Sequence, residues 1–337
     1  MPDKAEKKSI WNKLFIAMTL IVALLLISVF YISYKNERFM DTSYAYKDNV
    51  SASDRFSDAV SDTFADRLVI SDNTISLEGV SMSSVSEKAL LFDIGNDRPV
   101  FAQGIYDRAY PASITKIMTA IVAMKYGNMN DVVTMQPEDF ALEEGSQVSG
   151  MTAGDTVTME QLFKTLLVYS ANDAAMAIAR HISGSVEKFV KLMNEEARSL
   201  GMTGTHFVNP HGLHDVDHYT CAYDIYLMLN AAKEYTMFTD TIRLKEYQLS
   251  VTRADGSVIS YRLDSTDKYL TGVKQLPQGV TLWGGKTGTT PEAGSCLSII
   301  VQNTKGVPFI AVVMNADNSS ALYSDMNTLL SQINNIQ

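Results

Sequence analysis

Three short polar motifs constrain the fold of this 337-residue chain most strongly, because their side chains work together only if the fold brings them into one site. In chain order they are Ser113-Ile114-Thr115-Lys116, Ser170-Ala171-Asn172 and Lys286-Thr287-Gly288. Each motif alone arises easily by chance. Together they predict an acyl-transfer site with a serine nucleophile and a lysine base.

The first motif carries the proposed nucleophile and base. Ser113 and Lys116 are three residues apart, so on a helix they share a face and come within hydrogen-bond reach. Ser113 also lies at the expected helix start, where free N–H groups favour negative charge. Lys116 acts as a base only if it is neutral, which requires burial or a neighbouring cation such as Lys286.

The second motif falls between two predicted helices, in a connection where side chains can reach a cleft. The Ser170 hydroxyl is a candidate proton relay between Lys116 and a leaving amine. The Asn172 amide can hold a substrate peptide group as both donor and acceptor.

The third motif precedes a predicted strand hairpin and is expected on or beside a strand at the sheet edge. Such an edge pairs with an extended peptide through its backbone. Lys286 is expected to attract a terminal carboxylate and Thr287 to donate a hydrogen bond to it. Gly288 permits close backbone approach. The N–H of Thr289, with that of Ser113, is expected to form an oxyanion hole.

Composition and charge bound the class of protein. A hydrophobic content of 46% allows a sizeable core. A formal net charge of −10 argues against a nucleic-acid partner, whose phosphates require a basic face.

The N-terminal region predicts an exported, membrane-anchored protein. Residues 14–34 carry no charge and are long enough to cross a bilayer as one helix. Lysines within residues 1–13 favour a cytoplasmic N-terminus. A cleaved signal peptide is the alternative, but no good cleavage site follows. Residues 35–82, rich in Ser and Asp, are expected to form a flexible extracytoplasmic linker, in which residues 53–69 could form a short helix.

Residues 83–337 predict one α+β domain, with an antiparallel sheet assembled from both ends of the sequence and a helical subdomain between them. Strands are expected at 88–93 and 99–102 and in two hairpins, 247–262 and 295–314. Helices are expected to start at Pro111, at the capping box Thr158–Gln161 and at Asp173, and to span 186–200, 222–233 and 322–336, with an irregular stretch from 202 to 220.

Two groups of residues invite other readings. Cys221 and Cys296 could pair in an exported protein, but their apolar surroundings favour two separate buried thiols. Four histidines between residues 206 and 218 suggest zinc, yet no H-E-x-x-H pattern is present, so neither a metal nor a cofactor is expected.

The motifs and their surroundings resemble the serine-type D-alanyl-D-alanine carboxypeptidases, the low-molecular-mass penicillin-binding proteins. The similar segments are Arg108–Ala120, Ser170–Ala175, Asn209–Leu213 and His218–Asp224. The resemblance implies a penicillin-binding, transpeptidase-like fold, an acyl-enzyme at Ser113, Lys116 as proton acceptor, Ser170 in proton transfer and Lys286 in substrate binding. The expected partners are peptidoglycan stem peptides, β-lactams and, through the N-terminal helix, the bacterial cell membrane, with the catalytic domain outside it.

Departures from the family pattern leave alternatives open. Some members carry an arginine after the final strand, but residues 318–324 have none, which leaves carboxylate recognition to Lys286 and Thr287. A class A β-lactamase is disfavoured because residues 205–220 contain no glutamate. An endopeptidase that cleaves peptide cross-links, or a penicillin-binding sensor or scaffold without turnover, remains possible from the sequence alone.

Overall fold

The computed structural model describes residues 72–336. The predicted cytoplasmic segment, the membrane helix at 14–34, most of the linker and the possible helix at 53–69 lie outside the described residues. Within 72–336, none of the helices combines the length and apolarity needed to cross a bilayer.

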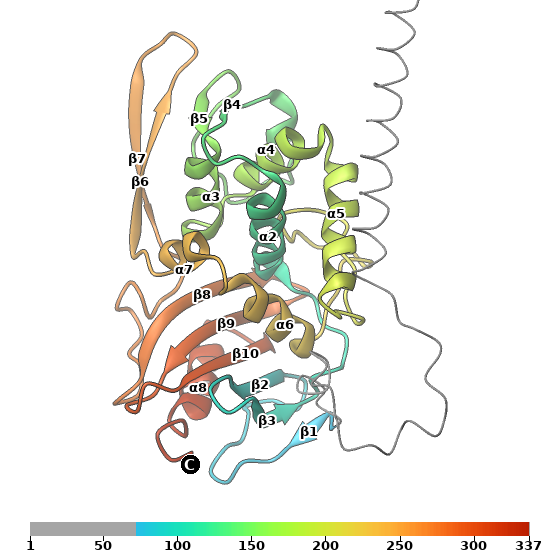
Figure 1. The fold of residues 1–337 in the computed structure, drawn as a ribbon, viewed down its shortest axis with the longest axis vertical. Coiled ribbons are helices and arrows are strands. Elements are labelled where there is room, and N and C mark those ends of the chain that lie inside the picture. Colours follow the sequence, from blue (N-terminus) through green and yellow to red (C-terminus); the bar gives the residue numbers. More distant parts are fainter. Residues whose placement is uncertain (1–71, 337) are drawn as a thin grey trace, which may run out of the picture. The chain divides into compact units, whose positions relative to one another are not determined.

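A six-stranded antiparallel sheet forms the base of the domain, in the order β1-β3-β2-β10-β9-β8 (Figure 1). The pairing of β2 with β10 joins the two ends of the folded sequence, as predicted. Strand β8 pairs only with β9 and therefore lies at one edge of the sheet. The strands are β1 (Thr74–Ile75), β2 (Lys88–Asp93), β3 (Arg98–Gln103), β8 (Thr281–Thr290), β9 (Gly294–Gln302) and β10 (Pro308–Ala316).

The central strands are apolar on both faces because helices cover both. Alternate residues of one strand enter different cores: Ile310 and Val312 of β10 belong to the core on the helical side, and Phe309 and Ala311 to the core beneath α8 (Ser319–Leu330). Side chains on both faces of β9 and β10 are therefore buried, which explains their nearly continuous apolar sequence.

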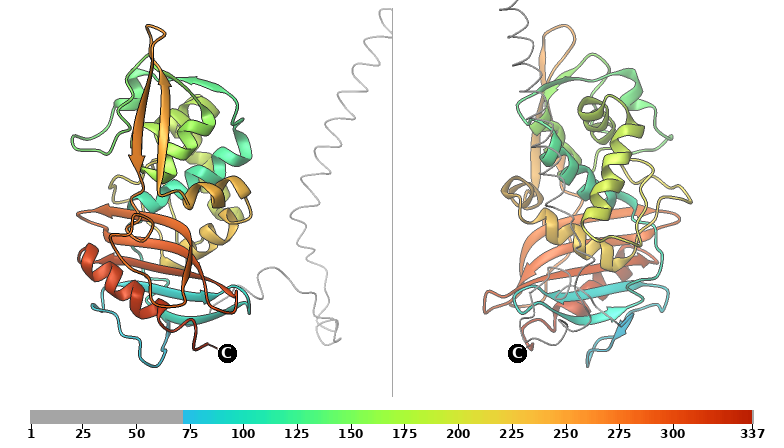
Figure 2. Two further views of the ribbon diagram at one scale, coloured as in Figure 1. Left: turned by 90° about the vertical axis from the view of Figure 1, so that its left-hand side faces the viewer. Right: turned by 45° about the vertical axis from the view of Figure 1, so that its right-hand side comes forward.

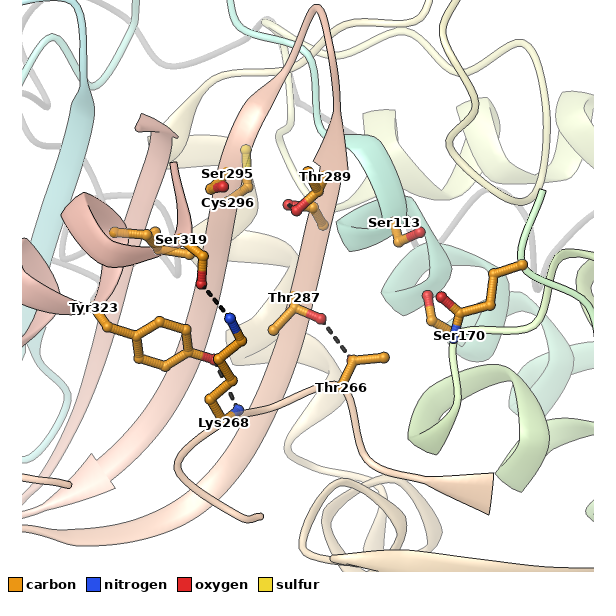
Figure 3. A pocket seen from close by; sticks show the side chains of 13 residues that line it. Ser113, Ser170, Thr266, Lys268, Thr287, Thr289, Ser295, Cys296, Ser319 and Tyr323 are labelled. Carbon is orange, nitrogen blue, oxygen red and sulfur yellow. Dashed lines mark hydrogen bonds between the residues drawn. The ribbon is translucent and has the colours of Figure 1, made fainter. Parts of the chain in front are cut away.

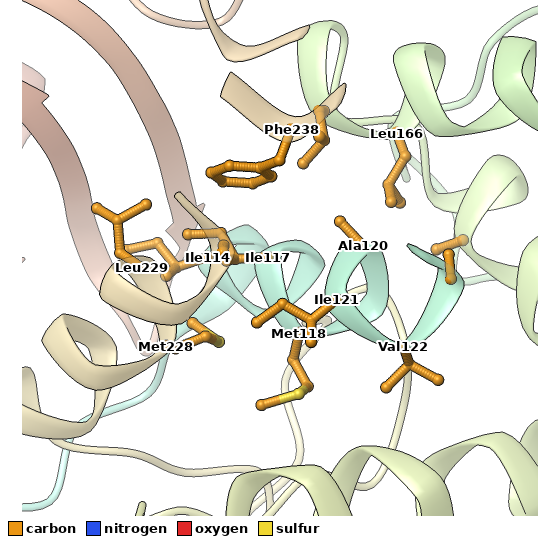
Figure 4. Packing of buried hydrophobic residues seen from close by; sticks show 14 of the residues in the cluster. Ile114, Ile117, Met118, Ala120, Ile121, Val122, Leu166, Met228, Leu229 and Phe238 are labelled. Atoms are coloured by element: carbon orange, nitrogen blue, oxygen red, sulfur yellow. The ribbon is translucent and has the colours of Figure 1, made fainter. Parts of the chain in front are cut away.

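The helical subdomain surrounds helix α2, whose residues Lys116 to Ala123 are all buried (Figure 4). Ile117, Ile121 and Val122 pack against the neighbouring helices, so α2 is enclosed from Lys116 to Ala123 and reaches the surface only at its C-terminal end. The helices are α2 (Lys116–Tyr126), α3 (Met159–Val168), α4 (Asn172–Ser183), α5 (Val186–Ser199), α6 (Ala222–Ala232) and α7 (Thr236–Ile242), with 3₁₀ turns η2 (Ala112–Thr115) and η3 (Pro137–Phe140).

The helix-start signals were right at α3 and wrong in detail at α4. At α3 the Thr158 hydroxyl accepts from the Gln161 N–H, and the Gln161 side chain accepts from the Thr158 N–H. At α4 the N-cap residue is Ala171, and Asp173 lies in the first turn. The Asp173 carboxylate accepts instead from the backbone and hydroxyl of Ser149, so it attaches a neighbouring loop to the helix.

The hairpin predicted at 247–262 does not join the main sheet. Its strands β6 (Glu246–Thr252) and β7 (Val258–Asp264) form a separate four-stranded sheet with β4 (Val132–Thr134) and β5 (Thr156–Thr158). Figure 2 shows the hairpin extending along the helical subdomain, away from the six-stranded sheet. The sequence showed the hairpin turn but not its partner, because β4 and β5 are three residues each and give no period.

Both ends of the folded domain differ from the expectation. Strand β1 pairs with β3 before residue 83, so the ordered fold begins earlier than the predicted boundary. The last helix is α8, Ser319–Leu330, not 322–336. It starts early because the Asn318 side chain accepts from the Ser320 and Ala321 N–H groups and caps it.

The two cysteines are separate buried thiols, as expected. Burial raises the pKa of both Cys221 and Cys296 to about 12, so both remain protonated and unreactive at neutral pH.

Glu87, just before β2, is fully buried, and within the described residues neither of its carboxylate oxygens has a hydrogen-bond partner. Burial and then the charge of Asp325 raise the pKa of Glu87 to about 7. Asp325 itself accepts from the Ser83 N–H and hydroxyl, which ties α8 to the segment before β2.

We predict that ionisation of Glu87 destabilises the fold. Because the pKa of Glu87 in the folded protein lies above the ordinary glutamate value of 4.5, the folded state binds more protons, and stability falls as the pH rises from about 4.5 to about 7. Glu87→Gln should remove this decline and be more stable than the parent at pH 8 by roughly 1–3 kcal/mol. Urea unfolding at pH 5 and pH 8 measures it.

The exposed residue Glu78 provides the control, because Glu78→Gln removes the same charge at the surface. If the stability of the parent and that of Glu87→Gln changed with pH in parallel, the pH dependence could not be assigned to Glu87.

Candidate active site

Ser113 lies in the 3₁₀ turn η2 and Lys116 is the first residue of α2, so the pair does not sit on one α-helix as predicted. The 3₁₀ turn brings Ser113 and Lys116 together more directly than an α-helix would, because side chains at i and i+3 are aligned in it. Of residues 111–120, Ser113 is the one that is not fully buried. The turn therefore presents the hydroxyl to solvent while keeping its base inside.

The turn is held in a strained conformation by close backbone contacts. Ala112 has φ of 46°, in the left-handed region. Its carbonyl is packed against Gly212, where an added Cβ would lie 1.9 Å from the Ala112 oxygen. Gly212 has φ of 90°, so both the space and the backbone conformation require glycine there.

The buried side-chain nitrogen of Lys116 contacts three segments of the chain. Nζ lies 2.8 Å from Ser113 Oγ and donates to Asn172 Oδ1 at 2.7 Å and to the His211 carbonyl at 2.7 Å. Two of these three partners are carbonyl oxygens, which only accept. A neutral lysine has two N–H groups and one lone pair, so when the two N–H groups serve the carbonyls, the lone pair is left for the Ser113 hydroxyl.

The environment of Lys116 favours this neutral form. Burial lowers the pKa of Lys116 well below its usual range, and the nearby charge of Lys286 lowers it further. The neighbouring cation expected from the sequence is therefore present, but it lowers the pKa of Lys116 less than burial does.

Ser170 and Lys286 form the second half of the site. Lys286 Nζ donates to Ser170 Oγ at 2.9 Å and to the Thr287 carbonyl at 3.0 Å. Burial lowers the pKa of Lys286 to about 7, while Asp267 acts in the opposite direction. Ser170 has φ of 67°, a strained conformation for a residue with a side chain.

Strand β8 brings the third motif against the nucleophile at the sheet edge, as predicted. An added Cβ at Gly288 would lie 2.8 Å from the Pro111 carbonyl and 2.9 Å from the Ser113 nitrogen, so only glycine lets strand and turn approach this closely. Thr289 is exposed, and Thr287, two residues earlier on the same strand, is half-buried. The Thr287 hydroxyl donates to Thr266 Oγ1 at 2.6 Å.

Asn172 uses its side-chain oxygen inside the protein, and its expected contact with a substrate amide stays a prediction. It is buried, its Oδ1 accepts from Lys116, and its own N–H donates to the Gln147 carbonyl. The geometry makes it a residue that orients Lys116 and holds the loop around residue 147.

The histidine-rich stretch is irregular, as predicted, and the imidazoles of His211 and His218 make internal hydrogen bonds. His218 Nδ1 accepts from the Val208 N–H and Nε2 lies 2.8 Å from Thr115 Oγ1, while His211 Nδ1 accepts from the Leu213 N–H. Burial lowers the pKa of both His211 and His218 to about 3, so both are neutral at physiological pH. Within residues 72–336 no three His, Cys, Asp or Glu side chains are grouped to hold a metal.

A cavity of about 260 Å³ opens over Ser113 and Ser170 and continues past Thr287 (Figure 3). Several of its lining residues were not predicted from the sequence, because they belong to loops and to the start of α8 and follow no motif. These residues are Gln147, Thr266, Lys268, Ser319 and Tyr323.

Curated relatives of the chain share one activity. It is 33% identical to the D-alanyl-D-alanine carboxypeptidase DacF of Bacillus subtilis over 68% of this chain and 57% of the relative. It is 30% identical to the D-alanyl-D-alanine carboxypeptidase DacC of Escherichia coli over 74% of this chain and 62% of the relative. The chain thus spans somewhat more than half the length of these relatives.

Solved structures and a family profile agree with this. The fold is similar to that of the DD-transpeptidase of Streptomyces K15, with a TM-score of 0.67 and 26% identity over 74% of this chain and 96% of that one. This similarity agrees with the predicted α+β class and helical subdomain. The profile of the family described as D-alanyl-D-alanine carboxypeptidase matches residues 78–318, and the chain belongs to that family.

Proposed function

We propose that this protein is a serine-type D-alanyl-D-alanine carboxypeptidase that removes the terminal D-alanine from peptidoglycan stem pentapeptides. The observation that carries the proposal is the buried Lys116, 2.8 Å from Ser113 Oγ with its two other contacts on carbonyl oxygens. Family membership supports the substrate class.

The reaction follows from the contacts. Ser113 Oγ attacks the carbonyl of the penultimate D-alanine while its proton moves to Lys116. The N–H groups of Ser113 and Thr289 receive the developing oxyanion. D-Alanine leaves with a proton that the Lys116 and Ser170 pair supplies, and water then hydrolyses the acyl-enzyme. β-Lactams acylate Ser113 by the same attack and are released slowly.

The location belongs to the same proposal. The apolar segment 14–34 anchors the chain in the bacterial cell membrane, and the catalytic domain lies outside it. Release from washed membranes by detergent, but not by high salt, tests the anchor.

A second candidate is acyl transfer to an amine. The similarity to a protein known as a DD-transpeptidase favours it, because transfer and hydrolysis share the acyl-enzyme and differ only in what attacks it. Adding an amine acceptor such as glycylglycine to the carboxypeptidase assay would reveal a transpeptidated product in place of the shortened peptide.

The first prediction concerns turnover. The parent should release D-alanine from diacetyl-Lys-D-Ala-D-Ala, and Ser113→Ala should abolish both this release and covalent labelling by fluorescent penicillin. Chromatography of free D-alanine and gel fluorescence measure the two. Labelling without release would instead indicate a cross-link endopeptidase or a penicillin-binding module without turnover.

The second prediction concerns pH. For the parent, kcat/KM should rise with pH as Lys116 loses its proton, and fall as the pH passes about 7, where Lys286 loses its charge. In Lys286→Gln the acidic limb should move to higher pH, because the cation that lowers the pKa of Lys116 is gone, and the limb near 7 should disappear.

Penicillin acylation rates between pH 4 and pH 9 measure these limbs. Lys305→Gln, at an exposed turn between β9 and β10, is the control and should keep the parental profile. An acidic limb unchanged in Lys286→Gln would refute the electrostatic coupling.

The third prediction concerns the strained turn. Gly212→Ala should slow penicillin acylation at least about tenfold, because the new methyl group pushes the Ala112 carbonyl and hence Ser113 out of position. Gly184 has φ of 76° but no atoms near its added Cβ, so Gly184→Ala carries a similar backbone penalty without the clash. Equal acylation rates in the two variants would argue against the role of this contact.

A further inference from the structure

Asp267 is a buried carboxylate beside the cavity that the proposed reaction leaves unused. It lies between Thr266 and Lys268, which line the cavity, and is itself 2% exposed. One carboxylate oxygen accepts from the Tyr269 N–H at 2.9 Å and from the Tyr323 hydroxyl at 3.4 Å. The other oxygen, Oδ2, is buried and has no hydrogen-bond partner in the described part of the chain. A buried carboxylate with one unpaired oxygen is costly unless a nearby opposite charge compensates it.

The loop that carries Asp267 is bonded to strand β8 next to Lys286. The Thr287 hydroxyl donates to Thr266 Oγ1 at 2.6 Å (Figure 3). Asp267 and Lys286 are the chain neighbours of these two threonines, so the contact brings the carboxylate and the lysine close to each other. On the other side of the loop, the Tyr323 hydroxyl of α8 donates to the Asp267 carboxylate and accepts from the next backbone N–H. The carboxylate is therefore held between β8 and α8.

Lys286 is a buried cation without a salt bridge. Its amine donates to Ser170 Oγ and to the Thr287 carbonyl, and none of the salt bridges in the described part of the chain includes it. Burial lowers the pKa of Lys286 to about 7, and the negative charge of Asp267 opposes this. Burial raises the pKa of Asp267, while its hydrogen bonds and the charge of Lys286 lower it. Each group thus favours the charged form of the other across the protein interior.

The titratable groups next to Asp267 on its loop and on α8 are neutral or cationic. Burial raises the pKa of the Tyr269 and Tyr323 phenols, and the charge of Asp267 raises it further, so both stay protonated. Lys268 directs its ammonium group to Ser319 Oγ at 2.7 Å. Neither the phenols nor this ammonium group supplies negative charge to Lys286.

A second buried carboxylate, Asp173 of α4, acts on the other lysine of the site. Both of its oxygens accept from the Ser149 N–H, and one also accepts from the Ser149 hydroxyl. Burial and the charge of Lys286 lower the pKa of Lys116, and the charge of Asp173 opposes them. A protonated Lys286 therefore favours a neutral Lys116, the form that accepts the proton of the nucleophile.

We propose that Asp267 is a positioning residue whose buried negative charge keeps the Lys286 amine protonated while the nucleophile is acylated. The inference rests on the proposed function and deepens it, because it names the residue that sets the upper pH limit of the same site. Without the Asp267 charge, Lys286 loses its proton at lower pH, and acylation stops at a pH where the parent still reacts.

Asp267→Asn tests this, because it removes the charge and keeps the shape of the side chain. The amide oxygen still accepts from the Tyr269 N–H and the Tyr323 hydroxyl. The rate of acylation by fluorescent penicillin is measured between pH 4 and pH 9 for the 337-residue protein in detergent and for its variants. Asp267→Glu restores the charge, and Asp264→Asn, at the exposed end of β7, is the matched control.

In Asp267→Asn the alkaline limb, near 7 in the parent, should move to lower pH by roughly one pH unit, and acylation at pH 7.5 should fall several-fold. Asp267→Glu should keep most of the parental profile, and Asp264→Asn should match it. In Lys286→Gln, which lacks the titrating amine, adding Asp267→Asn should leave the shape of the profile unchanged. Asp267→Ser removes the same charge with a smaller side chain, and it repeats the test if urea unfolding shows the amide variant to be unfolded.

The other outcomes overturn the proposal. A rate lowered equally at every pH, with the alkaline limb unmoved, would mean that Asp267 only supports the loop. A profile that Asp267→Asn still displaces in Lys286→Gln would mean that the carboxylate acts on a different group. A folded parent that penicillin does not acylate would refute the proposed function itself, and the role of Asp267 with it.

Discussion

The site depends on burying one lysine amine where three chain segments meet. Lys116 Nζ contacts the nucleophile turn, the start of α4 and the histidine-rich stretch, through Ser113, Asn172 and His211. An isolated buried ammonium is costly, and loss of its proton relieves that cost. Burial of Lys116 therefore has a free-energy cost and at the same time makes the amine a base. Because its two N–H groups donate to carbonyl oxygens, the lone pair is left for the Ser113 hydroxyl.

Much of the surrounding structure keeps this lysine in place. The first eight residues of helix α2, Lys116 to Ala123, are all buried, so its first residue cannot move without disturbing the core. Both segments that present hydroxyls to the cavity contain a residue with a left-handed backbone, Ala112 in one and Ser170 in the other. Gly212 and Gly288 allow backbone to approach the nucleophile turn from two directions. Strained residues persist only where neighbouring contacts impose them, and here close packing on both sides does so.

The sequence predicted the parts of the fold that have a local signal. The capping box at Thr158 and the strand at 88–93 follow from side-chain chemistry and period, and the structure confirms both. Lys286, Gly288 and Ser113 were rightly expected to come together, because their chemistry is useful only in combination. The partner of the 247–262 hairpin and the early start of α8 were missed, since three-residue strands and a single capping asparagine stand out too weakly from their surroundings.

What the sequence determined by itself is the kind of chemistry: a serine, two lysines and small residues at spacings that suit acyl transfer. Only the tertiary structure decided how each group is used. It turned Asn172 toward Lys116, joined Ser170 to Lys286 and brought Lys268 from an unpatterned loop into the lining of the cavity. The physical reason is that motifs record neighbours along the chain, whereas protonation state and ligand contacts depend on burial and on residues that are distant in sequence.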